Sequence, residues 1–488
     1  MDMVMLSRIQ FALIVTFHFV FVPMSVGLGL IQGIFQTKYY RSRDPKDAAA
    51  VRLWTKIFAV TFTVGVATGI TEEFSFGTNW ADYSRFVGDI FGAPLAAEAL
   101  FAFFMESVFL GVLLFGGKRI GPKFRLVSSW LVFAGSLLSA LWIIIANSWM
   151  QTPAGAVLSA DGSKAIITDF FAAAFNPSTG ARYFHTATAV LVMGGFFAMA
   201  VAGYYLLKKR HTDFAKKTAR IGCIVAVISA CALLVSAHTT AVGVSENQPT
   251  KLAAMEGMYE DEAAPLYLFG FVDEENQQVI APISIPGGTS FLATNDFNTV
   301  LPGLNSLSQT DQFGDLNPEE MPVNLVFSTY HTMVAMFGLI CLILLLVIIG
   351  LVRKKIPDWK WLQRIMIISP LFPFLAIEAG WWTAEVGRQP WVVYPVVGGP
   401  DGVSLLTENG ISLSVTPTEM VITIVIFVVI YALLFVAWAR LVAKFIKEGP
   451  EESADDGLAS ASDAALGEGS AKAAVSAAPA AALQKDGE

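Results

Sequence analysis

Nine apolar runs, each of about 20 residues or more, alternate with polar stretches along the chain. They lie near residues 9–35, 53–72, 94–116, 126–150, 184–207, 219–244, 325–352, 365–386 and 419–446. Each run is long enough for a helix to cross the hydrocarbon of a bilayer, and the runs lack the short apolar-polar alternation of barrel strands. The sequence therefore predicts an all-α polytopic membrane protein with nine transmembrane helices.

Lys and Arg are divided unevenly between the connections. The connections at 38–52, 118–125, 208–220 and 353–364 hold 20 of them, whereas the N-terminal stub and the alternate connections hold six. Because positively charged loops stay in the cytoplasm, we expect the N-terminus outside and the C-terminus in the cytoplasm. The first run has no basic leader and is too long for the apolar part of a signal peptide, so we expect it to be retained.

The pattern divides the chain into four regions. We expect a six-helix membrane region at 1–244, an outer loop at 245–324, a three-helix membrane region at 325–447 and a disordered cytoplasmic tail at 448–488. The chain is 55% hydrophobic and 15% charged, with a mean hydropathy of +0.58, as a membrane protein requires. Its net charge of −8 comes largely from the outer loop and the tail, and nothing else in the sequence indicates nucleic acid binding.

Four side chains that can bind a metal fall inside the apolar runs: His18, Glu98, His185 and Met333. A charged group in hydrocarbon costs about 2.5–3.5 kcal/mol on insertion scales, so each needs a reason. A membrane His often only hydrogen-bonds a neighbouring helix, and a Met usually fills a core. The charge bias and residue counts place all four in the outer half of the membrane. An imidazole and a thioether suit a low-spin heme, whereas one ligand with an open opposite face suits a heme that meets oxygen.

A second group of polar residues lies in the third and fourth runs. Glu106 follows Glu98 by eight residues, which on an ideal helix places it about 12 Å deeper and about 80° around. With Ser107 on the same helix and Ser139 and Asn147 on the next, it predicts a hydrogen-bonded path for protons from the cytoplasm. The alternative is an acid paired with a neighbouring helix.

Two polar stretches on the outer side also carry candidate chemistry. Residues 245–257 read SENQPTKLAAMEG, and between 245 and 322 the loop holds thirteen acids but one cation, Lys251, close to Glu256. Lys251 either balances local charge or, with Glu256 as the base, serves an acidic electron donor. Residues 378–391 read EAGWWTAEVGRQPW, which by itself indicates an interfacial aromatic belt with one salt bridge.

These stretches resemble subunit I of the cytochrome bd quinol oxidases. The pattern QPxKxAAxEG at 248–257 is similar to the quinol-binding loop of that family, in its short-loop branch, and GRQPW at 387–391 is similar to another of its signatures. The resemblance covers about residues 1–447. It implies oxidation of membrane quinol at the outer face and reduction of O2 to water with cytoplasmic protons, which builds a proton motive force without pumping. It also implies a bacterial plasma membrane, a heterodimer with subunit II, and room for small accessory subunits.

The resemblance further implies roles for single residues. His185 and Met333 match the ligands of a low-spin heme b, and His18 and Glu98 match those of a paired high-spin heme b and heme d. The residues matched to a proton path are Glu106, Ser107, Ser139 and Asn147. Those matched to the surroundings of the hemes are Trp381, Glu385 and Arg388, with the Arg388 charge directed at propionates. Those matched to the quinol site are Lys251 and Glu256.

Some alternatives stay open. His331, two residues before Met333, stands where many relatives carry Arg, and it is a rival heme ligand. The ligands do not identify the macrocycle, so a cyanide-insensitive relative with heme b in place of heme d is an alternative. Outside the family, a proton-coupled transporter would also bury Glu98 and Glu106, and an assembly or anchoring subunit would bind no heme of its own. The short loop favours menaquinol over ubiquinol as the donor.

Overall fold

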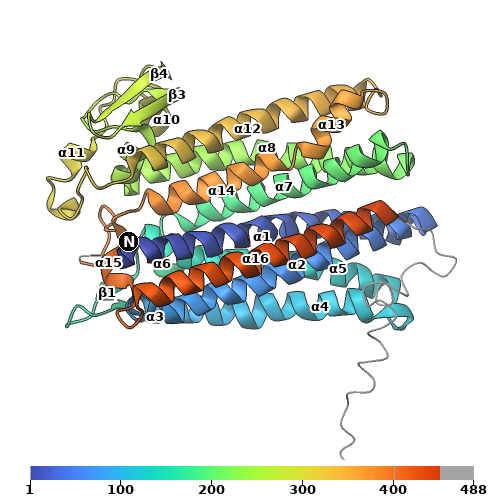
Figure 1. Cartoon of the computed structure of the whole chain (residues 1–488), viewed down its shortest axis with the longest axis horizontal. Coiled ribbons are helices and arrows are strands. Elements are labelled where there is room, and N and C mark those ends of the chain that lie inside the picture. The colour runs from blue at the N-terminus through green and yellow to red at the C-terminus, as the bar shows by residue number, and fades with distance from the viewer. Residues whose placement is uncertain (1, 401, 451–488) are drawn as a thin grey trace, which may run out of the picture.

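The computed structural model describes residues 2–400 and 402–450. Within these residues, nine helical segments are long and apolar enough to cross a membrane, which confirms the predicted number of spans. Figure 1 shows them lying side by side as one elongated bundle, with the β3–β4 hairpin and α11 at one end. The tail expected at 448–488 lies, from residue 451 onward, outside the described residues.

The first six spans are α1 (Met3–Ser42), α2 (Pro45–Thr78), α3 (Ala81–Ala97) continued by the π-helical turn η1 (Glu98–Phe103) and α4 (Phe104–Phe115), α5 (Pro122–Gln151), α7 (Thr179–Leu207) and α8 (Thr212–Asn247). The last three are α12 (Val323–Val352), α13 (Lys360–Ile368) continued by α14 (Leu371–Val386), and α16 (Pro417–Glu448). The short helices are α6 (Phe170–Ala174), α9 (Pro249–Glu256), α10 (Gly288–Thr294), α11 (Leu304–Leu307) and α15 (Thr407–Gly410), with 3-10 turns η2 (Gly117–Arg119) and η3 (Asp311–Phe313). The strands form antiparallel pairs: β1 (Ala156–Leu158) with β2 (Ala165–Ile167), β3 (Leu266–Asp273) with β4 (Gln278–Ile285), and β5 (Trp391–Val393) with β6 (Leu405–Leu406).

Several helices begin where the sequence supplies a cap. Asp44 precedes α2 and its carboxylate accepts a hydrogen bond from the Lys46 backbone N–H at 2.9 Å. Thr416 precedes α16 and forms a capping box with Glu419. In both helices a proline occupies the first turn, where its missing N–H is not needed.

The third span begins at Ala81 and not near residue 94, where the apolar run begins. Asp89 and Pro94 interrupt the apolar pattern without ending the helix, so hydropathy alone places the start too late. Counted from the apolar run that begins near residue 94, Glu98 would lie close to the start of this span, but in the helix Ala81–Phe115 it lies halfway along.

The spans form two helix groups that pack against each other. In the first group α1, α2, the α3–η1–α4 helix and α5 contact one another in a ring, and in the second group α7, α8, α12 and α14 do the same. Figure 1 shows the second group lying above the first, with α16 against α1 and α2. The groups meet where α1 crosses α7 at Gly27 and Gly194, and a Cβ on Gly27 would come within 2.6 Å of the Gly194 Cα. Small residues at this crossing let the two backbones touch.

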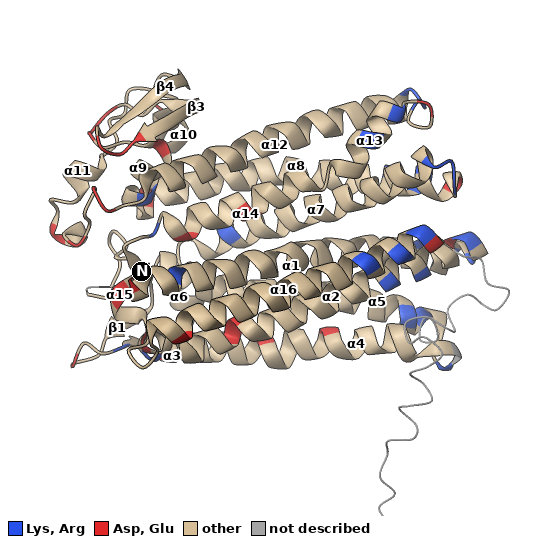
Figure 2. Ribbon diagram, viewed as in Figure 1, with Lys and Arg blue, Asp and Glu red and all other residues tan. Residues whose placement is uncertain are grey.

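The charged residues lie at opposite ends of the bundle. Figure 2 shows Lys and Arg gathered where α1 meets α2, α7 meets α8 and α12 meets α13, and Asp and Glu around the β3–β4 hairpin and α11. The segment that carries Lys251 and Glu256 therefore lies at the end opposite the basic connections.

Candidate functional site

His18 lies in the first helix group and is oriented by α2. Its Nδ1 is 2.8 Å from the Thr68 hydroxyl oxygen, and that hydroxyl lies 2.8 Å from the Gly65 carbonyl oxygen, to which it donates its only hydrogen. The imidazole must then donate from Nδ1, and its lone pair is on Nε2. A histidine held in this way presents Nε2 to a metal.

His185 is held in the same way in the second helix group. Its Nδ1 is 3.2 Å from the Ser236 hydroxyl oxygen on α8, and the Ser236 hydroxyl donates to the Leu233 carbonyl oxygen at 2.9 Å. The lone pair of His185 is therefore also on Nε2. In both cases a Ser or Thr hydroxyl on a neighbouring helix fixes the tautomer of the histidine.

Met333 belongs to the same group as His185. Its sulfur lies against α14 at Gly380, where a Cβ would come within 2.8 Å of Sδ. Glycine at this position leaves the thioether room between the helices. The structure thus places an imidazole and a thioether in one four-helix group, as a low-spin heme would require.

Glu98 and Glu106 both face α5. The Ser139 hydroxyl donates to Glu98 Oε1 at 2.7 Å, and a Cβ on Gly135 would come within 2.6 Å of Glu106 Cγ. The π-helical turn η1 takes up one extra residue, so the eight-residue separation turns the chain by about 20° and not the about 80° of an ideal helix. The predicted angle was wrong because a π turn leaves no mark on the spacing of apolar residues.

The four residues matched to a proton path do not form one cluster. Glu106 on α4 packs against α5 at Gly135, one turn from Ser139, and the Ser136 hydroxyl of α5 interacts with the Glu106 carboxylate. Ser107 is exposed on α4, and Asn147 lies farther along α5. The Asn147 amide donates to Glu385 Oε1 at 3.0 Å, so it belongs to a second polar cluster.

This second cluster, called the cation cluster below, consists of Arg182, Lys251 and Arg388 around the Glu385 carboxylate. Arg388 donates to Glu385 Oε2 at 2.6 Å, and Arg182 donates to the amide oxygen of Asn147. Lys251 donates from Nζ to the amide oxygens of Gln248, at 3.0 Å, and Gln151. The remaining links are Gln248 to Gln151 and Gln151 to Glu385.

The cation cluster holds more positive charge than it neutralises. Three basic side chains surround one carboxylate, and within the described chain Arg182 Nε and two guanidinium nitrogens of Arg388 are buried without a hydrogen-bond partner. Burial, and then Arg182 and Arg388, lower the pKa of Lys251 well below its ordinary value. Buried cations without partners require anions, so the cluster fits the carboxylates of a heme.

Glu256 lies on the other face of α9. The helix begins at Pro249 and ends at Gly257, whose backbone is left-handed with φ 66°. The five residues from Lys251 to Glu256 turn the chain by about 140°, so the two side chains point to different neighbours. Glu256 is buried, burial raises its pKa to about 8, and its Oε2 is 3.9 Å from His331 Nε2.

Trp381 lies between the two helix groups. Its ring centroid is 6.0 Å from that of Phe19 and 6.4 Å from that of Phe11, both on α1. The neighbouring Trp382 donates to the Thr16 hydroxyl oxygen at 3.0 Å. These tryptophans therefore join α14 to α1 between the candidate ligands of the two groups.

Sequence reasoning missed several of these residues. Arg182 entered only as one charge in a loop, although it precedes His185 by three residues and so lies one turn away on the same helix. That spacing, a lone cation one turn from a candidate ligand, is a usable signal. Thr68, Ser236 and Gln151 are ordinary polar residues of long helices, and nothing local distinguishes them.

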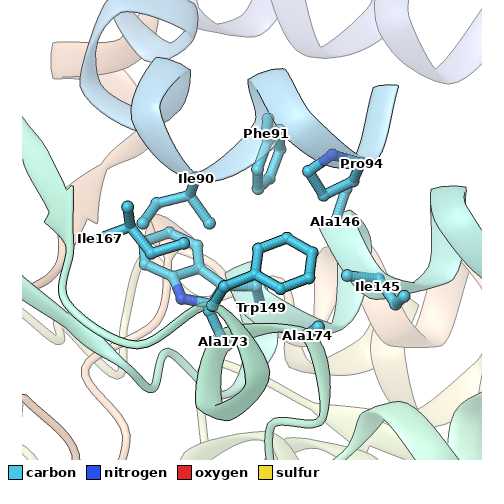
Figure 3. A pocket seen from close by; sticks show the side chains of 10 residues that line it. Ile90, Phe91, Pro94, Ile145, Ala146, Trp149, Ile167, Ala173 and Ala174 are labelled. Atoms are coloured by element: carbon cyan, nitrogen blue, oxygen red, sulfur yellow. The ribbon is translucent and has the colours of Figure 1, made fainter. Parts of the chain in front are cut away.

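A small apolar pocket lies apart from these clusters, between α3, α5, β2 and α6 (Figure 3). It is lined by Ile90, Phe91, Pro94, Ile145, Ala146, Trp149, Ile167, Phe170, Ala173 and Ala174. Every lining side chain is apolar, so the pocket offers no ligand or base.

Comparisons with known proteins bear on this arrangement. The family model described as cytochrome bd terminal oxidase subunit I matches residues 6–450. The chain belongs to this family. It is 37% identical over 460 residues to cytochrome bd ubiquinol oxidase subunit 1 of Bacillus subtilis, covering 92% of this chain and 95% of that protein. It is 33% identical to cytochrome bd-II ubiquinol oxidase subunit 1 of Escherichia coli, covering 92% and 97%.

A solved structure agrees with the family assignment. The bd oxidase from Geobacillus thermodenitrificans superposes with a TM-score of 0.80 at 28% identity, over 92% of this chain and 99% of the solved one. This cytochrome bd subunit I is therefore a multi-pass bacterial membrane protein of a terminal quinol oxidase, an oxidoreductase of electron transport. The family implies that it carries hemes, and it favours the oxidase over the transporter and the heme-free anchor.

Proposed function

We propose that this cytochrome bd subunit I oxidises quinol at the outer face and delivers the electrons to O2, with N-terminus outside and C-terminus in the cytoplasm. The observation that carries the proposal is the contrast between the two faces of α9, where buried cations lie on one side and a buried carboxyl on the other. The gathering of Lys and Arg at the opposite end of the bundle supports the orientation. Water is formed with cytoplasmic protons, so charge is separated without a pump.

His185 and Met333 hold a low-spin heme b in the second helix group. The fixed tautomer of His185 and the space left by Gly380 beside the Met333 sulfur support this. His18 and Glu98 hold the high-spin heme b and heme d, one each, in the first group. When bound, the hemes carry electrons from the donor and supply the iron at which oxygen is reduced.

The cation cluster holds the heme propionates. Arg182 and Arg388 offer buried N–H groups without partners, and Glu385 keeps the cations in place through its hydrogen bonds to Arg388 and Asn147. Lys251 completes the cluster through its hydrogen bonds to Gln248 and Gln151. Trp381 packs between α14 and α1 and limits access of water to the space between the groups.

Lys251 and Glu256 serve the quinol from the two faces of α9. The neutral carboxyl of Glu256 loses its proton to outside water, and the resulting carboxylate then removes the hydroxyl proton of the quinol. Two O–H bonds of the quinol break in all: one proton forms an O–H bond on Glu256, the other leaves to outside water, and the two electrons would pass to the hemes. Lys251 adds positive potential that favours the oxygen anion forming on the ring.

Protons for water enter on the other side of the first group. Glu106 and Ser139, with Ser136 between them on α5, lead toward Glu98. Asn147 extends the polar line along α5 to Glu385, and Ser107 adds a hydroxyl on the exposed side of α4. A partner covering α4 would enclose that side.

Subunit II is the proposed heterodimer partner, and small accessory subunits can join. The surface of η1 and α4 supports this, because Leu100, Phe101 and Phe104 are 69%, 63% and 66% exposed there. Such an apolar surface faces either lipid or another apolar helix.

A spectrum of the complete oxidase tests the heme proposal. The reduced-minus-oxidised spectrum should show low-spin and high-spin heme b, and heme extraction should also release heme d. If the extract contains only heme b, the third heme is a second high-spin heme b and not heme d. A preparation with no Soret band would overturn the proposal. His18→Ala and Glu98→Ala should each weaken carbon monoxide binding; if both leave it unchanged, they are not the ligands.

A further inference from the structure

His331 faces the donor side of α9 and is fixed as a hydrogen-bond acceptor. It lies on α12, one turn after Phe327, and stacks on that ring at a centroid distance of 4.0 Å. Its Nδ1 is 2.8 Å from the Phe327 carbonyl oxygen. A carbonyl only accepts, so Nδ1 carries the hydrogen and the neutral imidazole keeps its lone pair on Nε2.

The group opposite Nε2 is the carboxyl of Glu256. Glu256 Oε2 is 3.9 Å away, too far for a direct hydrogen bond, and Nε2 and both carboxyl oxygens are buried without a partner in the described part of the chain. The Tyr267 backbone lies beside both groups: its carbonyl is another acceptor next to the imidazole, and its N–H lies near the Glu256 carboxyl. The Thr289 hydroxyl near Glu256 donates to the Pro265 carbonyl oxygen at 3.1 Å. The unpartnered lone pair of His331 Nε2 indicates a site built for a ligand that donates a hydrogen there.

We propose that the gap between His331 and Glu256 receives one hydroxyl of the quinol, and that His331 distinguishes quinol from quinone. This inference rests on the proposed function and specifies its donor site. The hydroxyl donates its hydrogen to His331 Nε2 and accepts the hydrogen of the Glu256 carboxyl. A quinone carbonyl can accept from Glu256 but has no hydrogen for Nε2, so its lone pairs face that of the imidazole. Substrate therefore binds more tightly than product, and product release is favoured.

The surroundings fit a flat hydroxylated ring. The rings of Tyr267, Phe327 and Tyr330 surround the imidazole, with centroid distances between 4.0 and 6.4 Å. The His331 side chain is 13% exposed and that of Glu256 is 0% exposed, so a ring enters past the imidazole and reaches the carboxyl last. Burial raises the pKa of Glu256 to about 8, so at neutral pH this carboxyl holds the hydrogen that it donates.

Recognition and proton removal are then successive events in one place. While Glu256 is neutral, the hydroxyl hydrogen points to His331. After Glu256 has released its proton to outside water, the hydroxyl turns its hydrogen to the carboxylate, which removes it. His331 keeps the same protonation throughout and acts by accepting a hydrogen bond.

The test compares a donor-only and an acceptor-bearing replacement in the complete oxidase. His331→Arg can only donate, whereas His331→Gln retains an amide oxygen that can accept. A short-chain quinol gives KM, and the matching quinone, used as a product inhibitor, gives Ki. The wild type should have a Ki about tenfold above KM, the contribution of about one hydrogen bond. His331→Arg should lower the Ki to KM ratio about tenfold or more, and His331→Gln should largely retain it. His238→Gln, at an exposed position on α8, is the control.

Each outcome decides the inference. A wild-type ratio near one, or the same ratio in His331→Arg as in the wild type, would mean that water and not quinol fills the gap. Loss of the low-spin heme spectrum in both His331 variants would make His331 a heme ligand and overturn the inference. If Glu256→Ala abolishes quinol oxidation while the His331 variants behave as the wild type, the donor site stands and only the role of His331 fails. If Glu256→Ala also has normal quinol kinetics, the proposed donor site itself fails.

Discussion

The two faces of α9 differ in what they lack. The Lys251 face belongs to a cluster with three buried cations, one carboxylate and several N–H groups without partners. The Glu256 face meets His331, where Nε2 of His331 and Oε2 of Glu256 are 3.9 Å apart and neither has a hydrogen-bond partner among the described residues. Excess donors fit the carboxylates of a heme, and an unpartnered acceptor beside a neutral carboxyl fits the hydroxyl of a quinol. In a membrane protein with few charges, the unsatisfied groups of each face thus indicate the class of ligand that it binds.

Because α9 is short, its two faces bring the two proposed binding sites close together. Pro249 and Gly257 limit the helix to eight residues, and within it the chain presents one basic and one acidic side chain about 140° apart. In the proposed arrangement the helix would separate the quinol from the heme propionates by its own width, about 10 Å. Electron transfer can cross this distance, while the protons of the quinol stay on the Glu256 side.

Substitution of His185, the proposed ligand of the low-spin heme, should have the largest effect on the spectrum of the oxidase. His185→Ala should abolish the low-spin heme signal and leave the high-spin signals, because Nε2 of His185 is replaced by nothing that can bind iron. The reduced-minus-oxidised spectrum measures this, with His238→Ala as the control. Met333→Leu should also lose the six-coordinate form. A variant Met333→Leu that remains low-spin, together with a His331→Ala that does not, would assign the ligand to His331.

Substitution of the two charged residues of α9, Lys251 and Glu256, should show that the two faces of the helix have different functions. Glu256→Ala and Lys251→Ala should each lower quinol oxidation about 100-fold or more while the hemes and their carbon monoxide binding remain. An artificial donor that reduces the hemes directly should restore oxygen consumption in Glu256→Ala. In Lys251→Ala the low-spin heme should also shift in potential, because Lys251 belongs to the cation cluster. Equal potentials in both variants would contradict the division of α9 into two faces.

The sequence predicts the fold far better than the ends of its elements. Long apolar runs can satisfy their backbone in lipid only as helices, so nine spans follow from nine runs. The ends do not follow, because polar residues such as Asp89 continue a helix that is apolar farther on. The π turn at Glu98 is invisible for a related reason: a π turn requires no particular residue.

The candidate site could be predicted as a set of residue types but not as an arrangement. His18 and His185 stand out as polar groups in apolar runs, yet the hydroxyls that fix their tautomers, Thr68 and Ser236, come from other helices. Arg182 joins Lys251 and Arg388 only through the packing of α5, α7, α9 and α14. The roles that rest on the resemblance to cytochrome bd subunit I, such as heme ligation and the proton path, stay predictions.

A substitution in the proposed proton path tests a step that involves neither face of α9. Glu106→Gln keeps the size of the side chain and its hydrogen bonding but cannot carry a proton as a carboxylate does. Oxygen consumption should fall about 10- to 100-fold, and reduction of the hemes by quinol should stay as fast as in the wild type. Stopped-flow reduction without oxygen, compared with steady-state turnover, separates the two. Normal turnover with full heme content would rule out an essential relay through Glu106.

The pH dependence of quinol oxidation should show the smallest effect. Burial raises the pKa of Glu256 to about 8, and the form that removes the quinol proton is the carboxylate. At pH 7 about a tenth of the molecules carry this form, so kcat/KM should rise with pH through a midpoint near pH 8 and level off about one pH unit higher, a gain of about tenfold. The rate rises with pH because the active form of Glu256 is the deprotonated one. If the pKa of Glu256 were depressed, kcat/KM would not change with pH in this range. Lys251 lies on the other face of α9, and burial and then Arg182 and Arg388 lower its pKa, so Glu256→Gln is the variant that identifies the titrating group. Glu256→Gln should therefore flatten the rise, whereas Glu262→Gln, at a carboxyl of the same loop, should preserve it. If kcat/KM of Glu256→Gln rises with pH by the same factor and with the same midpoint as in the wild type, another group titrates and Glu256 is not the base.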